Sequence, residues 1–179
     1  MLPLLLVSVL VTGGFEAGGH IGVTFPSSGL ENTHDAAALF GISLSYATAA
    51  ERLMLEYGYT GLQAKQTSPY RFDINRLSFG YGHEFAVGRP AAGTTSYWGF
   101  EASASAGLGL LSRAVGSARE AGRSPFGIVG LGFFQRQGHS RLSLGLDNFL
   151  FGESRPAGSS RTVSVTYLIG IKGGVAYVF

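Results

Sequence analysis

The sequence predicts an all-β protein: a closed eight-stranded antiparallel up-and-down transmembrane β-barrel. Three observations favour this fold class. Apolar residues alternate with small or polar residues along most of the 179-residue chain, which indicates strands with two chemically different faces. Charged residues make up only 13%, against about 25% in ordinary soluble domains. Long polar connections also alternate with short ones, as expected for a membrane barrel.

The last strand is predicted at residues 163–179. Its odd-numbered positions are β-branched or aromatic except for Gly173, and its even-numbered positions are mostly small or polar. This segment is much longer than the usual strand of about 5–6 residues. At roughly 3.3 Å per residue, it is long enough to cross a tilted bilayer.

The same alternation predicts seven earlier strands, at residues 15–25, 37–47, 51–60, 72–85, 95–110, 125–136 and 141–149. Their more apolar faces carry, in order, Ile21 and Val23; Phe40 and Ile42; Leu53 and Leu55; Leu77 and Phe79; Trp98 and Phe100; Val129 and Leu131; and Leu142 and Leu144. The alternation breaks at residues 73–75, which predicts either a bulge or an extension beyond the membrane.

Turn residues separate these strands. Short turns are predicted at 48–50 and 137–140, and a longer one at 86–94. Long polar loops are predicted at 26–35, 63–69, 111–124 and 152–162, of which 111–124 is the longest. Aromatic residues near both ends of the strands predict two interfacial girdles. The predicted girdle residues are Tyr46, Phe85, Trp98, Phe133 and Phe179 at one end, and Phe25, Tyr59, Phe126, Phe149 and Tyr167 at the other.

Residues 1–14 are apolar and similar to the core of a secretory signal, although they lack a basic segment. They are interpreted as a short or truncated signal peptide, with residues 15–179 as the barrel domain. An extension of the first strand or a mis-set start codon is the alternative. Cysteine is absent, so disulfides play no part.

A soluble eight-stranded barrel would show similar alternation. Its outer face would carry many Lys and Glu residues. Here the less apolar face is mostly Gly, Ser and Ala with scattered charges, which suits the narrow interior of an eight-stranded membrane barrel.

Phe179, preceded by Tyr177 and Val175 on the same face, resembles the C-terminal assembly signal of bacterial outer-membrane barrels. Residues 15–179 resemble the OmpA/OmpX type, in the outer membrane protein β-barrel domain family. The resemblance implies a Gram-negative outer-membrane location with both termini periplasmic. It also implies contacts with outer-membrane lipid and lipopolysaccharide, and with the barrel assembly machinery and periplasmic chaperones during biogenesis. A monomer is expected. The fold hosts adhesins, anchors, pores and lipid A-modifying enzymes, so it does not decide the activity.

Alternation places nine charged residues inside the barrel: Glu16, Arg52, Glu56, Arg76, Glu84, Glu101, Arg141, Asp147 and Lys172. Unpaired charges in a narrow lumen are costly, so these residues are expected to form ion pairs. The network is interpreted as a structural plug, with a gated ion path as the alternative.

Other candidate sites are weaker. His139, Ser140 and Asp147 supply the residue types of a Ser–His–acid hydrolase. Asp147, however, is roughly 20 Å or more along the strand from the turn that contains His139 and Ser140. No catalytic residue is therefore assigned. The histidines show no metal-ligand spacing, and no metal or cofactor is expected. A net charge of +2 gives no indication of nucleic-acid binding. Five loop arginines are candidate contacts for lipopolysaccharide phosphates, with solvated loop charge as the alternative: Arg113, Arg119, Arg123, Arg155 and Arg161.

Together these observations predict a non-enzymatic integral membrane barrel with a plugged polar lumen. Its expected role is structural, or interactive through its outer loops. A narrow pore for ions or small solutes is the first alternative, and a lipid A-modifying enzyme is the second.

Overall fold

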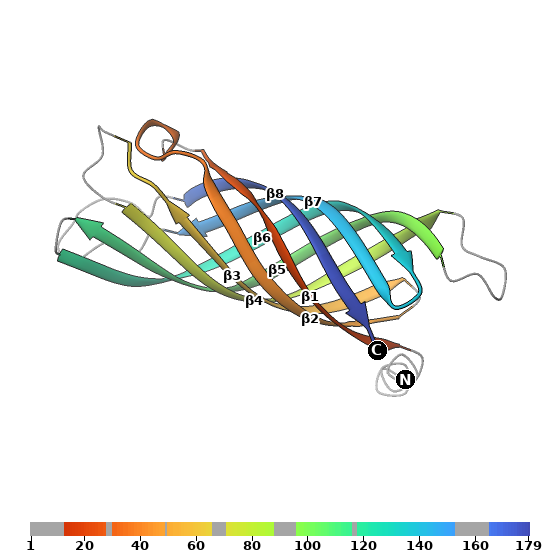
Figure 1. Ribbon diagram of the computed structural model, residues 1–179. Coiled ribbons are helices and arrows are strands. Elements are labelled where there is room, and N and C mark those ends of the chain that lie inside the picture. The colour runs from red at the N-terminus through yellow and green to blue at the C-terminus, as the bar shows by residue number, and fades with distance from the viewer. Residues whose placement is uncertain are drawn as a thin grey trace.

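The computed structural model describes residues 13–27, 30–48, 50–65, 71–87, 96–115, 118–152 and 165–179, which form a closed antiparallel barrel (Figure 1). Its strands are β1 (Gly14–Pro26), β2 (Ala37–Ala47), β3 (Glu51–Leu62), β4 (Arg71–Val87), β5 (Ser96–Val115), β6 (Ala118–Gln137), β7 (Ser140–Gly152) and β8 (Val165–Val178). A short 3-10 helix, η1 (Leu30–Asn32), lies between β1 and β2. Each strand pairs with its neighbours in sequence, and β8 pairs with β1. The predicted fold class is confirmed.

No helix in the described part of the chain is long and apolar enough to cross a membrane. The start of β1 and the end of β8 lie at one end of the barrel (Figure 1), which we call the terminal end; the opposite end is the loop end. Residues 1–12, most of the predicted signal peptide, lie outside the described residues.

The strand pairing fixes the geometry of the barrel. Following the paired residues once around the barrel from Glu16 leads back to β1 at Pro26, a shift of ten positions. Such a shear in an eight-stranded barrel requires strongly tilted strands, typically by about 35–45°. The lumen of a barrel this size is filled by side chains.

The predicted loop at 111–124 is wrong. β5 and β6 continue as a paired hairpin to Val115 and Ala118, which are opposite each other. This part of the hairpin lacks the apolar alternation of a bilayer-spanning strand. Beyond the bilayer, water can solvate both faces of a strand, so two strands can pair there without alternating apolar residues. The missing alternation at 111–124 therefore does not indicate a loop.

The irregular residues 73–75 form a regular strand rather than a bulge. Pairing between β4 and β5 is uninterrupted from Arg71 opposite Ala114 to Val87 opposite Trp98. Phe72 and Ile74 point inward and are buried, while Asp73 lies on the outward face. The polarity of the two faces is therefore reversed at the loop end, as the extension interpretation requires.

The outward face forms a wide apolar belt. Ile21, Ile42 and Leu131 expose 67%, 65% and 64% of their surfaces, and every strand contributes exposed large apolar residues. An apolar surface that encircles the molecule far exceeds the patches found on soluble monomers. The belt is instead what hydrocarbon chains would cover, so the barrel is a transmembrane protein.

The inward face is divided into two regions. Toward the terminal end it is polar and charged. Toward the loop end it is filled by an apolar cluster, which we call the apolar plug: Leu30, Ala37, Leu39, Leu62, Phe72, Ile74, Leu111, Phe126, Ile128, Phe149, Phe151 and Leu168. Phe126 and Phe149 were predicted in the outer girdle, and this prediction is wrong. They are only 8% and 3% exposed because their positions on β6 and β7 point into the lumen, whereas Leu150 beside Phe149 lies on the outward face.

The aromatic girdle at the terminal end is present on the outward face. Phe85, Trp98 and Phe179 are 54%, 43% and 71% exposed, and the Trp98 ring lies against Phe133. Such rings are typical of bilayer interfaces, where an apolar body meets a polar boundary.

Glycine is required at two positions for different reasons. Gly138 has a φ of 57° in the short turn between β6 and β7, a conformation that other residues rarely adopt. Gly22 lies in β1 where a side chain would collide with the backbone of Ile171 and Lys172 in β8. Gly22 thus permits the close approach of the two strands that close the barrel.

Leu144 tests the assignment of the two faces, since it lies on the lipid-facing side of β7 and is 59% exposed. We expect Leu144→Arg to lower the free energy of unfolding by about 2–4 kcal/mol if it lies near the bilayer midplane. Urea unfolding in lipid vesicles, followed by Trp98 fluorescence, measures this cost. Ser143→Ala is the control for the neighbouring inward position, and a neutral Leu144→Arg would contradict the assigned faces.

Candidate functional site: the charged lumen

The nine charged residues assigned to the lumen from alternation all have side chains that are at most 24% exposed in the structure. They come from six strands, β1, β3, β4, β5, β7 and β8, and meet because every second residue of each strand points inward. They form two separate clusters of ion pairs, one above the other along the barrel axis.

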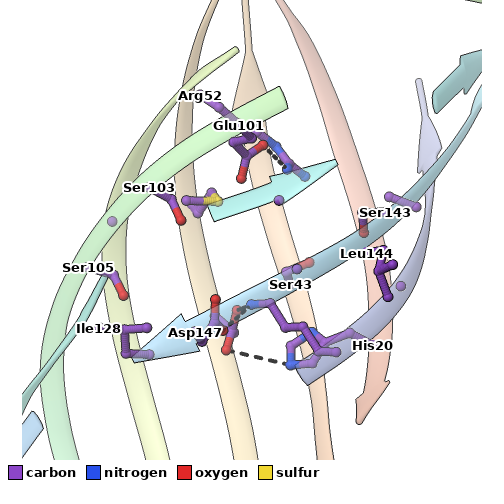
Figure 2. A pocket seen from close by; sticks show the side chains of 18 of the residues that line it. His20, Ser43, Arg52, Glu101, Ser103, Ser105, Ile128, Ser143, Leu144 and Asp147 are labelled. Atoms are coloured by element: carbon purple, nitrogen blue, oxygen red, sulfur yellow. Dashed lines mark hydrogen bonds and ion pairs between the residues drawn. The ribbon is translucent and has the colours of Figure 1, made fainter. Parts of the chain in front are cut away.

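The terminal charge layer is the cluster nearer the termini. Its members are Glu16, Arg52, Glu84, Glu101, Arg136 and Arg141. Arg52 pairs with Glu16 at 2.9 Å. It also pairs with Glu101 at 3.0 Å (Figure 2). Arg141 pairs with Glu101 at 2.6 Å and with Glu84 at 3.1 Å. Glu84 and Glu101 are directly opposite in the register, so Arg141 between them relieves the repulsion of two like charges.

The central charge layer lies closer to the middle of the barrel. Glu56 forms ion pairs with Arg76 at 3.1 Å and with Lys172 at 3.4 Å. The Nε2 atom of His20 lies 3.6 Å from Glu56 Oε1. Lys172 also pairs with Asp147 at 2.7 Å. Arg52 and Glu56 are four residues apart in β3, which is about 13 Å along the strand. Because the strand is tilted by about 40°, the two layers are separated by roughly 10 Å along the barrel axis.

Each layer is electrically neutral. The terminal layer contains three glutamates and three arginines, and the central layer contains Glu56 and Asp147 with Arg76 and Lys172. A buried charge without a partner is strongly destabilising, so local neutrality is the condition under which a narrow lumen can hold ten charges.

Sequence reasoning missed two members of these layers, Arg136 and His20. Without Arg136 the assigned charges sum to −1, and its 3.5 Å contact with Glu16 completes the terminal layer. Its even number on a strand whose even positions point inward was the signal that could have identified it. His20 could have been found in the same way on β1, where Glu16 and Thr24 also point inward.

A cavity of about 90 Å³ separates the two charge layers (Figure 2). Five serines contribute to its wall, because their small side chains leave space where larger ones would fill the lumen: Ser43, Ser78, Ser103, Ser105 and Ser143. The cavity is large enough and polar enough to hold a few water molecules.

The apolar plug follows the central layer toward the loop end. Arg76 links the two regions, since its guanidinium pairs with Glu56 and lies 4.8 Å from the centre of the Phe149 ring. A small space of about 20 Å³ remains inside the plug, lined mainly by apolar side chains. The lumen of the described barrel is therefore polar at the terminal end and closed by packed apolar side chains at the loop end.

The three residues considered for hydrolysis do not meet. His139 Nδ1 lies 2.8 Å from the carbonyl oxygen of Val178 in the turn at the terminal end. Asp147 lies inside the barrel on Lys172, seven residues along β7 from Ser140. The described residues also contain no group of three side chains suited to hold a metal ion.

The loop arginines are only partly described. Arg123 is exposed on β6 near the loop end. Arg113 and Arg119 lie in the β5–β6 hairpin, where only the backbone is described, and Arg155 and Arg161 lie outside the described residues.

The C-terminal residues close the barrel seam. Val175, Tyr177 and Phe179 are on the outward face and are 56%, 52% and 71% exposed. The backbone N–H of Phe179 donates to the carbonyl of Phe15 at 2.9 Å, and the Tyr177 ring stacks on His139 at 5.6 Å.

An encircling apolar belt, a closed backbone and a filled polar lumen define a small transmembrane β-barrel of the outer-membrane type. Comparison with solved structures supports this class. The neisserial surface protein A structure matches with a TM-score of 0.63 at 14% identity, covering 92% of this chain and 97% of that one. The attachment invasion locus protein Ail of Yersinia pestis matches with a TM-score of 0.52 at 10% identity, covering 93% and 97%.

The N-terminal β-barrel domain of Pseudomonas aeruginosa OprF matches with a TM-score of 0.51 at 15% identity, covering 93% of this chain and 99% of that one. No family model matches the chain, and no curated protein sequence matches it. The fold is thus that of the small eight-stranded outer-membrane barrels.

Glu101→Gln tests the energetic role of the terminal layer, because this residue pairs with both Arg52 and Arg141. Removing its charge leaves buried arginines underpaired, so we expect a loss of about 3–5 kcal/mol in the free energy of unfolding. Glu51→Gln is the matched control, since Glu51 pairs with His83 where both side chains are about 40% exposed. That change should cost about 1 kcal/mol or less. Equal costs in urea unfolding would contradict the assigned role.

Proposed function

We propose that this protein is a non-enzymatic outer-membrane barrel with a closed lumen, whose role is structural or depends on interactions of its loop end. The apolar plug is the observation that carries the proposal. An ion crossing the lumen would have to leave the charge layers and pass packed side chains such as Phe72, Phe149 and Leu168, each at most 3% exposed. Transfer of an ion into such surroundings is strongly unfavourable.

In the proposed orientation both termini are periplasmic and the loop end faces outward. Three of the four connections at the loop end (β1–β2, β3–β4 and β7–β8) are long, and two of the three at the terminal end (β2–β3 and β6–β7) are short turns, which supports this orientation. The exposed Arg123 lies near the loop end, where phosphate groups of lipopolysaccharide are the proposed ligands, together with Arg113, Arg119, Arg155 and Arg161. Val175, Tyr177 and Phe179 are proposed to be read by the barrel assembly machinery, and the barrel is proposed to be a monomer.

A narrow pore is the second candidate, and the serine-lined cavity is the observation that favours it. In this case the plug would have to move aside to connect the cavity with the loop end. A lipid A-modifying activity lacks comparable support, because His139 and Asp147 lie in different parts of the barrel.

Planar-bilayer recordings distinguish the first two proposals. We expect no discrete channels from the refolded wild-type protein. Phe149→Ala combined with Phe126→Ala should produce measurable conductance, because both rings fill the lumen between the serine cavity and the loop end. Channels in the wild type that change with Glu101→Gln would overturn the closed-lumen proposal.

The matched control is Phe79→Ala, which removes a ring from the lipid-facing side of β4 that is 62% exposed. It should remain silent. Heat-modifiable mobility in gels verifies that each variant is folded before recording. A silent double variant that is folded would show that the plug does not set the barrier.

A further inference from the structure

The lipid-facing surface is hollowed at one place. A groove of about 770 Å³ lies across β8, β1, β2 and β3 on the outside of the barrel. Its apolar walls include Ile21, Phe40, Ile42 and Val175, which are between 49% and 67% exposed. These residues belong to the belt that meets hydrocarbon, so the groove opens into the bilayer rather than into water.

The groove exists because glycines replace the large side chains expected on this face. Gly19 in β1 and Gly173 in β8 occupy outward positions and line the groove, and the backbone of Gly41 and Gly174 completes its floor. A Cβ at Gly19 or Gly173 would meet backbone oxygens only at 3.5 Å or 3.8 Å, which is ordinary contact. Barrel closure therefore does not require glycine at these two positions.

The groove is narrow at its floor. Gly19 has Val175 directly opposite on one side and Ile42 directly opposite on the other. These flanking residues are two strand spacings apart, about 9–10 Å between backbones, and their side chains narrow the opening further. A transmembrane helix is about 10–12 Å across, so it could not reach the floor. A single hydrocarbon chain could.

A polar ladder borders the groove toward the loop end. Tyr57 and Tyr59 line the groove. The Tyr57 hydroxyl donates to Asn75 at 2.8 Å, and the Tyr59 hydroxyl donates to Asp73 at 2.8 Å. Arg71 donates to Asp73 and to the Tyr59 hydroxyl, both at 2.9 Å. The groove thus changes from apolar to hydrogen-bonding and charged in one direction, as an amphipathic ligand would require.

We propose that this groove binds one acyl chain of a phosphate-bearing membrane lipid in the leaflet at the loop end, with the phosphate beside Tyr59 and Arg71. The site goes beyond the proposed function and depends only on the barrel spanning a bilayer. The chain lies along the glycine floor between Val175 and Ile42, and the arginine, held in place by Asp73 and Tyr59, faces the phosphate.

Photolabelling tests the proposal. The refolded protein is placed in phosphatidylethanolamine vesicles that contain a phosphatidylcholine probe with a diazirine in mid-chain, and adducts are mapped by mass spectrometry. We expect several-fold more adducts at Ile21, Ile42 and Val175 than at Ala104 and Val129 on the opposite side. Gly19→Leu combined with Gly173→Leu fills the groove and should abolish this excess.

The matched control is Gly127→Leu, an outward glycine of β6 at which a Cβ would meet only Ser105 O at 3.8 Å. It should leave groove labelling unchanged, and heat-modifiable gel mobility verifies folding of all variants. Arg71→Gln should reduce labelling by the phospholipid probe but not by a diazirine fatty acid methyl ester, which lacks the phosphate. Even labelling around the belt would overturn the proposal. So would dimers of Ile42→Cys or Val175→Cys variants that are linked by disulfides on addition of an oxidant and that compete with lipid labelling, which would assign the groove to a second copy.

Discussion

The structure depends on one constraint: backbone N–H and C=O groups in a bilayer must be hydrogen-bonded within the protein. Pairing of β8 with β1 satisfies it by removing the sheet edges. Closure with eight strands and a shift of ten positions then fixes a narrow interior. The close approach at Gly22 and the bond from Phe179 to Phe15 are local consequences at the seam.

The narrow interior explains why the lumen is organised in layers. Side chains from opposite walls meet at the axis, so a charged residue on one strand needs its partner at the same height on another strand. Glu84 and Glu101 are adjacent by register and would repel without Arg141 between them. Neutrality within each layer, rather than across the whole lumen, is the arrangement that this geometry favours.

The sequence was sufficient to predict the strands and their two faces within the membrane, because only one solvent acts on each face there. It was misleading where the solvent changes. Toward the loop end the inward positions become apolar as well, so Phe126 and Phe149 lie in the lumen. The arginine-rich end of β6 remains paired with β5. The ion-pair partners of Glu16 and Glu56 also depend on the register between strands, which alternation within one strand does not specify.

The plug and the groove show that side-chain size differs between the two faces of the barrel wall along its length. Large apolar side chains fill the lumen toward the loop end, and on β4 the outward positions beside them are the polar Arg71 and Asp73. Gly19 and Gly173 make the barrel wall thin beside the central charge layer. The groove therefore lies on the outer side of the wall, at the same height as the contacts of His20 and Lys172 with Glu56 inside the lumen. An occupant of the groove would keep hydrocarbon packed against that thin wall. The buried ion pairs behind that wall would then lie beside a filled surface of low dielectric constant, where the attraction between opposite charges is stronger than in water.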